Sequence, residues 1–405
     1  MLTPAQIDLI KGTVPVLQAH GVELTKHFYA RMLTRHPELR NIFNHTHQVH
    51  GAQQKALAAA ILAYAANIDH LERLEGAVKQ IAQRHCSLGV HAEQYAVVGE
   101  NLLASIKEVL GEAATPELIE AWRVAYEQLS GILIHAEQEI YAKQEAKEGG
   151  WSGWRSFQCV NRVKECSDVE SFYFIPSDFG PVPTYKAGQY TTIRIHSKAL
   201  NLTQPRQYTL SQAPTGSMLR VTVKAIHSDA GHPDGLVSNH LHTLVHVGDE
   251  VELSAPTGTF VLDDVKAESP LVFIAAGIGI TPIVPMLEEL ATENPLRPVH
   301  FLYSTQNSAH YPLRKDVEAA LKGMPNAGKG VYFTNPGPDD HLGADFDVEG
   351  RITVDKIRSF CQHPDADFYI CGPIDFMKDM SNALQQIGVL PGRIHTETFS
   401  TGGLE

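Results

Sequence analysis

A histidine near the end of a predicted helix is the first group in the sequence that suggests chemistry. His85 follows the helical run Ile81–Arg84 and precedes Gly89, a residue type that commonly ends helices. An iron porphyrin needs one neutral imidazole on a rigid helix, with the second ring nitrogen held by a hydrogen bond. Tyr95 lies within reach downstream, and Glu137 lies on a later predicted helix. The chain has 21 histidines, so the proposed haem ligand depends on the residues around it.

Side chains on earlier predicted helices suit the opposite face of such a haem. Tyr29 lies in a helix that Pro37 interrupts, and Phe43 follows where an aromatic ring can pack on a porphyrin. Gln53 and Leu57 are four residues apart and therefore share one helix face. Gln53 offers a polar amide and Leu57 an apolar wall, and the Tyr29 hydroxyl can stabilise negative charge on a bound ligand.

A second group of residues suits a flavin. In the strand pattern Arg206–Thr209, Arg206 and Tyr208 share one face because side chains alternate. A guanidinium can pair with a pyrophosphate, and a tyrosine ring can lie against an isoalloxazine. Thr209 places a backbone N–H and a hydroxyl near the flavin edge. A short predicted helix that opens near Gly235 suits a phosphate at its N-terminus. The predicted flavin-binding residues are Tyr190, Arg206, Gln207, Tyr208, Thr209, Val237, Ser238 and Asn239.

A third group suits a nicotinamide nucleotide. An apolar strand that begins at Pro270 runs into Gly277 and Gly279, and a helix is expected to start near Thr281-Pro282. Two glycines between a strand and a helix let the backbone approach a phosphate closely. Ser304–Asn307, at the end of another strand, contains no Arg or Lys to hold a 2′-phosphate, which favours NADH over NADPH. The predicted contacts of this turn are Gly277, Ile278, Gly279, Ile280, Thr281 and Pro282.

The predicted secondary structure around these residues changes in type twice along the chain. Apolar residues recur at helical spacing up to about Gly150. Six short alternating runs then predict an antiparallel barrel. Further on, buried strands that alternate with helices predict a doubly wound parallel sheet with ligands at the carboxyl ends of its strands. We therefore expect a multidomain protein with boundaries 1–148, 149–265 and 266–405.

Composition narrows the classes of function. The chain of 405 residues is 43% hydrophobic, as is usual for globular proteins, and its net charge of -13 argues against a nucleic-acid partner or an anionic membrane. The five cysteines show no zinc, iron–sulfur or covalent-haem spacing and are expected to be reduced in a cytoplasmic protein. Glycines and prolines interrupt the most apolar stretch, so we expect no membrane span and no signal peptide.

Together these motifs resemble those of the flavohaemoglobins, bacterial or fungal globins fused to a flavin reductase related to ferredoxin–NADP reductase. The resemblance runs essentially end to end. It implies an all-α globin domain, an FAD-binding β-barrel and an α/β NAD(P)H-binding domain, with non-covalent haem b, FAD and NADH or NADPH as cofactors. It makes His85 the proximal iron ligand. The other residues that it places at the cofactors are Tyr29, Gln53 and Leu57 on the distal side, Phe43 on the haem, Tyr95 and Glu137 beside the proximal imidazole, Cys371, Gly372 and Pro373 at the nicotinamide, and Glu397 and Phe399 at the flavin.

The sequence departs from the family pattern at three places. Arg84 stands where a lysine is common, near the haem–flavin junction, and Arg and Lys differ in geometry. Thr209 replaces a more usual serine and keeps the hydroxyl. Ser400-Thr401 replaces a usual Gly-Pro after Phe399. We expect altered redox tuning from these changes rather than the loss of a cofactor.

The resemblance implies an NAD(P)H-dependent nitric oxide dioxygenase that converts nitric oxide and O2 to nitrate. Because a hydride carries two electrons and haem iron accepts one at a time, a flavin is the needed intermediary. The alternatives are an NADH-dependent reductase of peroxides or quinones and a gas carrier or sensor, which would not need a complete reductase. Small-molecule substrates, no nucleic acid, no obligatory membrane partner and a monomeric state are expected.

Overall fold

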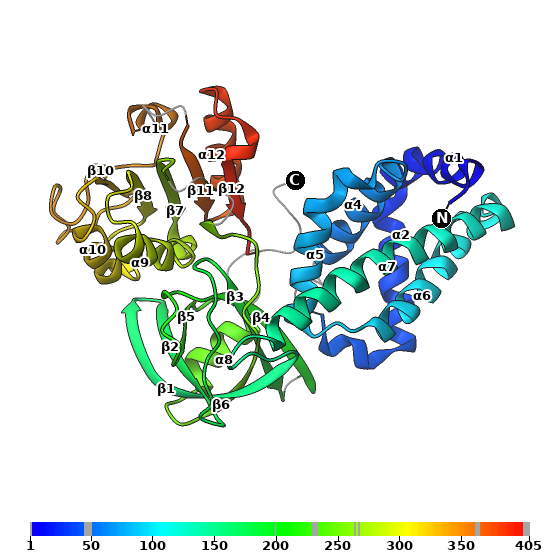
Figure 1. Cartoon of the computed structure of the whole chain (residues 1–405), viewed down its shortest axis with the longest axis horizontal. Coiled ribbons are helices and arrows are strands. Elements are labelled where there is room, and N and C mark those ends of the chain that lie inside the picture. The colour runs from blue at the N-terminus through cyan, green and yellow to red at the C-terminus, as the bar shows by residue number, and fades with distance from the viewer. Residues whose placement is uncertain are drawn as a thin grey trace.

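The computed structural model of the chain describes residues 2–43, 51–198, 200–228, 234–262, 265, 268–360 and 365–399. Three bodies follow one another along the chain (Figure 1). We call them the helical domain, the barrel domain and the sheet domain. The barrel domain touches both of the others, and the helical and sheet domains lie on different sides of it. The predicted order of an all-α, an antiparallel β and a parallel α/β domain is confirmed.

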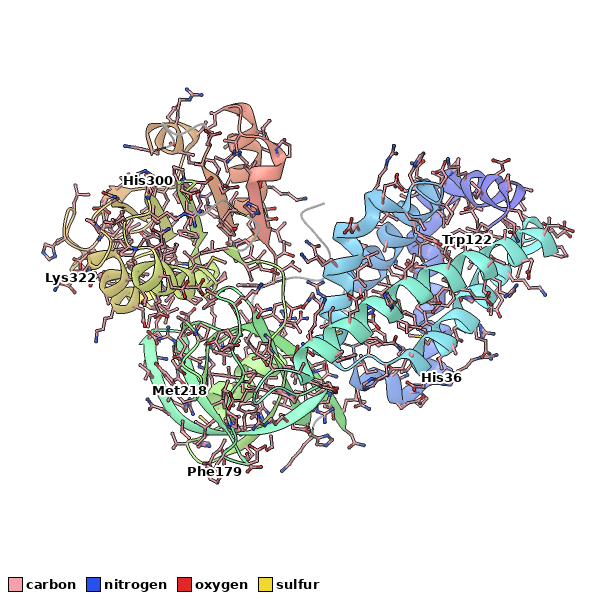
Figure 2. The ribbon with its side chains drawn as sticks, in the orientation of Figure 1. His36, Trp122, Phe179, Met218, His300 and Lys322 are labelled. Carbon is pink, nitrogen blue, oxygen red and sulfur yellow. The ribbon has the colours of Figure 1, made fainter. Side chains whose placement is uncertain are left out.

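The helical domain is built from long helices with a shared core. The first helix begins at Pro4, where Thr3 and Gln6 form a reciprocal capping box. Phe28, Met32 and Trp122 are at most 3% exposed in the core, and Figure 2 shows Trp122 between the helices. The elements are α1 (Pro4–Gly12), α2 (Val14–Arg35), η1 (Pro37–Asn41), α4 (Ala52–Ala66), η2 (Leu71–Leu74), α5 (Glu75–Leu88), α6 (Ala92–Leu110), η3 (Gly111–Ala113) and α7 (Pro116–Glu145).

The helix that carries His85 ends where its glycine predicted. Helix α5 continues through His85 to Leu88. Gly89 ends it with φ 70°, a left-handed conformation that glycine adopts without a steric penalty. His85 therefore lies in the last turn of a regular helix.

The barrel domain contains a six-stranded antiparallel sheet in the order β4-β3-β6-β1-β2-β5. An isolated bridge between Leu210 and Val221 joins the ends of that order and closes the sheet on itself. The fourth strand starts earlier than predicted and includes Pro205, which is tolerated because β4 pairs there with β3 and meets β5 further on, at Leu210. The elements are β1 (Trp154–Cys166), β2 (Val169–Pro176), β3 (Tyr190–Ser197), β4 (Leu202–Thr209), β5 (Leu219–Lys224), α8 (Leu236–Leu244) and β6 (Glu250–Ser254).

The sheet domain has six parallel strands in the order β10-β9-β8-β7-β11-β12. The chain builds outward from β7 to β10 and then crosses to the other side of β7, so the strand order reverses between β7 and β11. Its elements are β7 (Leu271–Ala276), η5 (Gly277–Ile280), α9 (Ile283–Glu293), β8 (Val299–Thr305), η6 (Ser308–His310), α10 (Arg314–Lys322), β9 (Ala327–Phe333), β10 (Val348–Glu349), α11 (Val354–Phe360), β11 (Asp367–Cys371), α12 (Ile374–Gln386), η7 (Pro391–Arg393) and β12 (Ile394–Glu397).

Two features of the sheet domain refine the expectation from the sequence. A 3-10 turn over Gly277–Ile280 separates β7 from α9, which begins at Ile283, just after the predicted Thr281-Pro282. The closing segment of the chain forms the edge strand β12, which pairs with β11. Within the described residues, no helix combines the length and the apolar character that crossing a bilayer requires.

Candidate functional site

Side chains from two other helices meet beside His85. The His85 Nδ1 atom lies 2.7 Å from a carboxylate oxygen of Glu137 on α7 and 2.9 Å from the hydroxyl of Tyr95 on α6. Tyr95 also donates a hydrogen bond to the same carboxylate oxygen. Glu137 is 2% exposed, and burial, followed by the hydrogen bond and the charge of Glu137, raises the pKa of Tyr95 well above its usual range. Tyr95 therefore stays a neutral donor.

This arrangement fits a haem ligand. A carboxylate accepts hydrogen bonds only, so Nδ1 of His85 donates to Glu137, and a neutral ring held in this way would offer a lone pair on Nε2. The contacts that the structure describes for His85 all use Nδ1. A neutral imidazole whose tautomer and orientation are fixed by a carboxylate is the donor set that an iron porphyrin requires. The residues present thus fit haem, whose iron would take Nε2 of His85 as its ligand.

The residues predicted for the distal side lie together on α2, α4 and the turn after η1. The rings of Tyr29 and Phe43 meet edge to face, with their centroids 5.6 Å apart. Tyr29 is 7% exposed; burial raises the pKa of its hydroxyl, and a hydrogen bond with Gln53 lowers it. Leu57, one turn beyond Gln53 on α4, packs against the core of the helical domain. A neutral tyrosine hydroxyl and an amide therefore share one apolar region.

An open cavity joins the haem-binding helices to the barrel domain. Its empty space amounts to about 770 Å³, open solvent included. Helices α4 and α5 contribute to one side, strands β3 and β4 to another, and the end of the chain to a third. It is lined by Ile42, Phe43, Gln53, Arg84, Leu88, Tyr190, Pro205, Arg206, Gln207, Thr209, Glu397, Thr398 and Phe399.

The barrel-domain residues at this cavity, together with Tyr208 beside them on β4, fit a flavin nucleotide. The buried hydroxyl of Tyr208 has no hydrogen-bond partner within the described residues. Burial lowers the pKa of Arg206, and the like charge of Arg84 lowers it further, while Tyr208 raises it. A pyrophosphate would relieve the desolvation of this guanidinium, and a polar cofactor would satisfy Tyr208. Burial raises the pKa of Tyr190 to about 12, so this side chain is a neutral donor at pH 7.

The two predicted nicotinamide turns lie against each other in the sheet domain. Gly277 has φ 53°, and a Cβ atom on Gly279 would lie 2.3 Å from the carbonyl oxygen of Cys371. Only glycine fits such a close approach of two backbones. The turns follow β7 and β11, at the point where the strand order reverses. A dinucleotide fits there, since ligands of doubly wound sheets bind at such a point.

Strand register connects the nicotinamide turn with the cavity at the junction. Cys371 pairs with Glu397 across the parallel strands β11 and β12. Glu397 in turn lines the cavity together with Arg84. Burial raises the pKa of Glu397 to about 7, although the charge of Arg84 lowers it. Strand β12 therefore places the Glu397 side chain of the sheet domain beside helix α5, which contains His85.

Some predicted residues lie away from this cavity. Val237 and Ser238 are buried at the start of α8, and the Asn239 side chain pairs with the backbone N–H and carbonyl of Ile226. Neither α8 nor the Gly277–Pro282 and Cys371–Pro373 turns line the cavity. Ser304–Asn307 lies at the end of β8, as predicted. Ser400 and Thr401 lie outside the described residues.

Sequence reasoning predicted Arg84 at the junction but missed the other residues of α5 that face the barrel domain. The Gln207 amide donates to the Ser87 hydroxyl at 2.9 Å, and the Gly258 N–H donates to the Gln83 side-chain oxygen at 3.0 Å. The ring nitrogen of Trp154 would lie 3.0 Å from a Cβ atom on Gly89. A serine or glutamine on a helix carries no signal of such a role. A helix face with two polar residues four apart was the available hint.

Comparisons with known proteins agree with this geometry. Three family models match: the globin model over residues 26–133, the oxidoreductase FAD-binding domain over 156–262 and the oxidoreductase NAD-binding domain over 273–382. The chain is 45% identical to a flavohemoprotein of Bordetella pertussis over the full length of both chains. It is also 45% identical to a flavohemoprotein of Rhizobium meliloti, covering 98% of each chain.

Solved structures show the same resemblance. The flavohemoglobin of Malassezia yamatoensis, with bound FAD and heme, superposes with a TM-score of 0.87 at 30% identity and covers 98% of this chain and 100% of its own. The FAD/NAD-binding domain of a nitric oxide dioxygenase from Vibrio cholerae superposes with a TM-score of 0.53 at 33% identity. That match covers 60% of this chain and 97% of the domain.

Proposed function

Because this chain belongs to the flavohaemoproteins, and thus joins a haem-binding globin to an NAD(P)H-dependent flavin oxidoreductase, we propose that it is a nitric oxide dioxygenase. Its substrates are nitric oxide, O2 and NADH. Each nitric oxide takes one O2 and one electron to become nitrate, so one hydride supports two turnovers. Bound haem iron supplies the centre at which the two gases combine, and bound FAD divides the hydride into single electrons.

Polar groups of the helical domain would affect a bound haem in two ways: through electron donation to its iron and through stabilisation of negative charge on its ligand. Glu137 accepts the Nδ1 proton of His85 in a hydrogen bond and so increases the electron donation of Nε2 to a metal. On the other side, Tyr29 and Gln53 provide hydrogen-bond donors in an apolar region, where they stabilise negative charge more than they would in water. Oxidation of a gas by O2 needs both effects.

The cavity shared by the two cofactor sites is the observation that carries this proposal. Gln53 and Arg84 of the helical domain line it together with Tyr190, Arg206 and Thr209 of the barrel domain. A gas carrier does not require electrons, whereas an enzyme that consumes one electron per turnover requires this proximity. The match to a nitric oxide dioxygenase reductase module supports the same assignment.

A peroxide reductase is the second candidate, because an imidazole paired with a carboxylate also favours cleavage of an O–O bond. The deciding experiment supplies NADH and nitric oxide to the purified protein, with and without O2. We expect nitric oxide loss that requires O2 and yields equal amounts of nitrate. Oxygen-independent loss, or loss without nitrate, would contradict the assignment, and faster NADH oxidation with peroxide than with nitric oxide would favour the second candidate.

A further inference from the structure

Helix α5 has two functional faces. His85 points to Glu137 and Tyr95 inside the helical domain. Two residues further on, the chain has turned by about 200°, so Ser87 faces the other way. Ser87 is completely buried although it is polar, and it lies against the barrel domain. Helix α5 is thus a rigid element between the imidazole and the flavin-binding strands.

The Ser87 hydroxyl connects three segments. It donates to the Arg84 carbonyl at 2.8 Å, within its own helix, and accepts a hydrogen bond from the Gln207 amide at 2.9 Å. It also interacts with the Tyr190 hydroxyl and lowers the pKa of that tyrosine. Gln207 and Tyr190 belong to the neighbouring strands β4 and β3. A single buried hydroxyl therefore joins both strands at the cavity to the last turn of α5.

Gln207 is suited to this role by its place in β4. It stands between Arg206 and Tyr208, the two residues that fit a flavin nucleotide, and its side-chain amide crosses to the helical domain. The path from Tyr208 to His85 runs through this hydrogen bond and the last turn of α5. One turn earlier on the same helix face, Gln83 accepts the Gly258 N–H and adds a second link.

We propose that Ser87 is a positioning residue that sets the distance between flavin and haem through its hydrogen bond with Gln207. This inference rests on the proposed function only in requiring that electrons pass from FAD to haem. Electron transfer between separated cofactors slows steeply with distance, so a loosened α5–β4 contact reduces its rate. The loss of one buried hydrogen bond costs about 1 kcal/mol, which shifts the population of the close arrangement about fivefold.

The test uses the complete protein with haem and FAD, without nitric oxide, under carbon monoxide to trap reduced haem. In Ser87→Ala, we expect electron transfer from flavin to haem to slow about fivefold and flavin reduction by NADH to keep its rate. Flavin fluorescence should increase, because a more distant haem quenches it less. In the double variant Ser87→Ala/Gln207→Met, the slowing should not exceed that of Ser87→Ala alone, because the two substitutions remove the same hydrogen bond.

Gln144→Met is the matched control. The Gln144 amide also crosses between the two domains, donating to the Pro256 carbonyl at 3.4 Å, but it lies on α7. We expect it to leave both electron-transfer steps unchanged. Unaltered flavin-to-haem transfer in Ser87→Ala, or equal slowing in Gln144→Met, would overturn the proposal. If Ser87→Ala does not fold, Gln83→Met carries the same expectation. A failure to form nitrate would contradict the proposed function and leave this result intact.

Discussion

At the scale of single residues, burial determines which groups stay neutral at the proposed reaction centre. Tyr29, Tyr95 and Tyr208 all have raised pKa values, and burial is the first cause in each case. A neutral tyrosine can donate a hydrogen bond, whereas a phenolate cannot. These three tyrosines are therefore neutral hydrogen-bond donors at physiological pH.

Tyr29→Phe tests the distal donor. Removing a hydrogen bond to a charged ligand costs about 1.5–3 kcal/mol, so the release of O2 from the reduced protein should become roughly tenfold to hundredfold faster. Stopped-flow measurement of O2 dissociation checks this. Tyr64→Phe is the control, because the equally buried Tyr64 hydroxyl donates to the Ala125 carbonyl, away from the distal residues. An unchanged dissociation rate in Tyr29→Phe would show that the Tyr29 hydroxyl does not stabilise bound O2.

Glu397→Gln tests the raised carboxyl pKa. In the unfolded chain this group titrates near 4.5, and in the folded protein near 7. The folded state therefore binds the additional proton between these values. The resulting stability is present below about pH 4.5 and is lost as the pH rises through about 7. Urea unfolding across this range should show that loss in the parent protein and a smaller one in Glu397→Gln. Parallel curves would show that Glu397 has an ordinary pKa.

At the scale of elements, the end of helix α5 is also the point at which this helix contacts the barrel domain. Gly89 stops the helix four residues after His85 and places its backbone against Trp154 of the barrel domain. The residue is needed twice, once for its left-handed conformation and once for the close contact. The end of α5 and the interface between the two domains are therefore one structural feature.

Gly89→Ala should destabilise the protein by about 1–2 kcal/mol from the left-handed conformation alone, and by more from the contact with Trp154. Gly153→Ala is a matched control, because Gly153 has the same φ of 70° and no atom within 4 Å of a Cβ atom. Chemical denaturation of both variants gives the comparison. Equal losses would mean that the ring of Trp154 adapts at no cost.

At the scale of the whole molecule, a buried arginine forms ion pairs between the barrel domain and the sheet domain. Arg220 on β5 is 4% exposed and lies 2.8 Å from Asp316 on α10 and 3.7 Å from Glu288 on α9. It also donates to the Ser211 carbonyl within the barrel domain. Burial lowers the pKa of Arg220, but the carboxylates raise it more, so this guanidinium remains charged.

Arg220→Met should loosen the sheet domain from the barrel domain. It leaves Asp316 and Glu288 without their cation, at a cost of about 3 kcal/mol. Hydride transfer from NADH to flavin should slow, while the haem absorption spectrum stays the same. Arg162→Met is the control, since Arg162 pairs with Glu170 inside the barrel domain. If both variants lose stability and neither loses hydride transfer, Arg220 serves the fold and not the alignment of the domains.

The sequence by itself determined the helix ends, strands and turns, because these features depend on residues that are close together in the chain. The helix end at Gly89, the six alternating runs of the barrel and the glycine turn after β7 are local patterns, and each formed where it was predicted or within a few residues of it. Periodicity, capping and turn chemistry act over a few residues, so they can be read along the chain. The order of the three domains followed from them.

Only the tertiary structure decided which separated residues meet. It brought Glu137 to His85, aligned Glu397 with Cys371, and placed Ser87 under Gln207. Each of these pairs joins elements whose relative placement depends on packing of whole faces and on strand register. No pattern of nearby residues encodes that placement, because a buried serine or glutamate has the same local sequence signal whichever partner it meets.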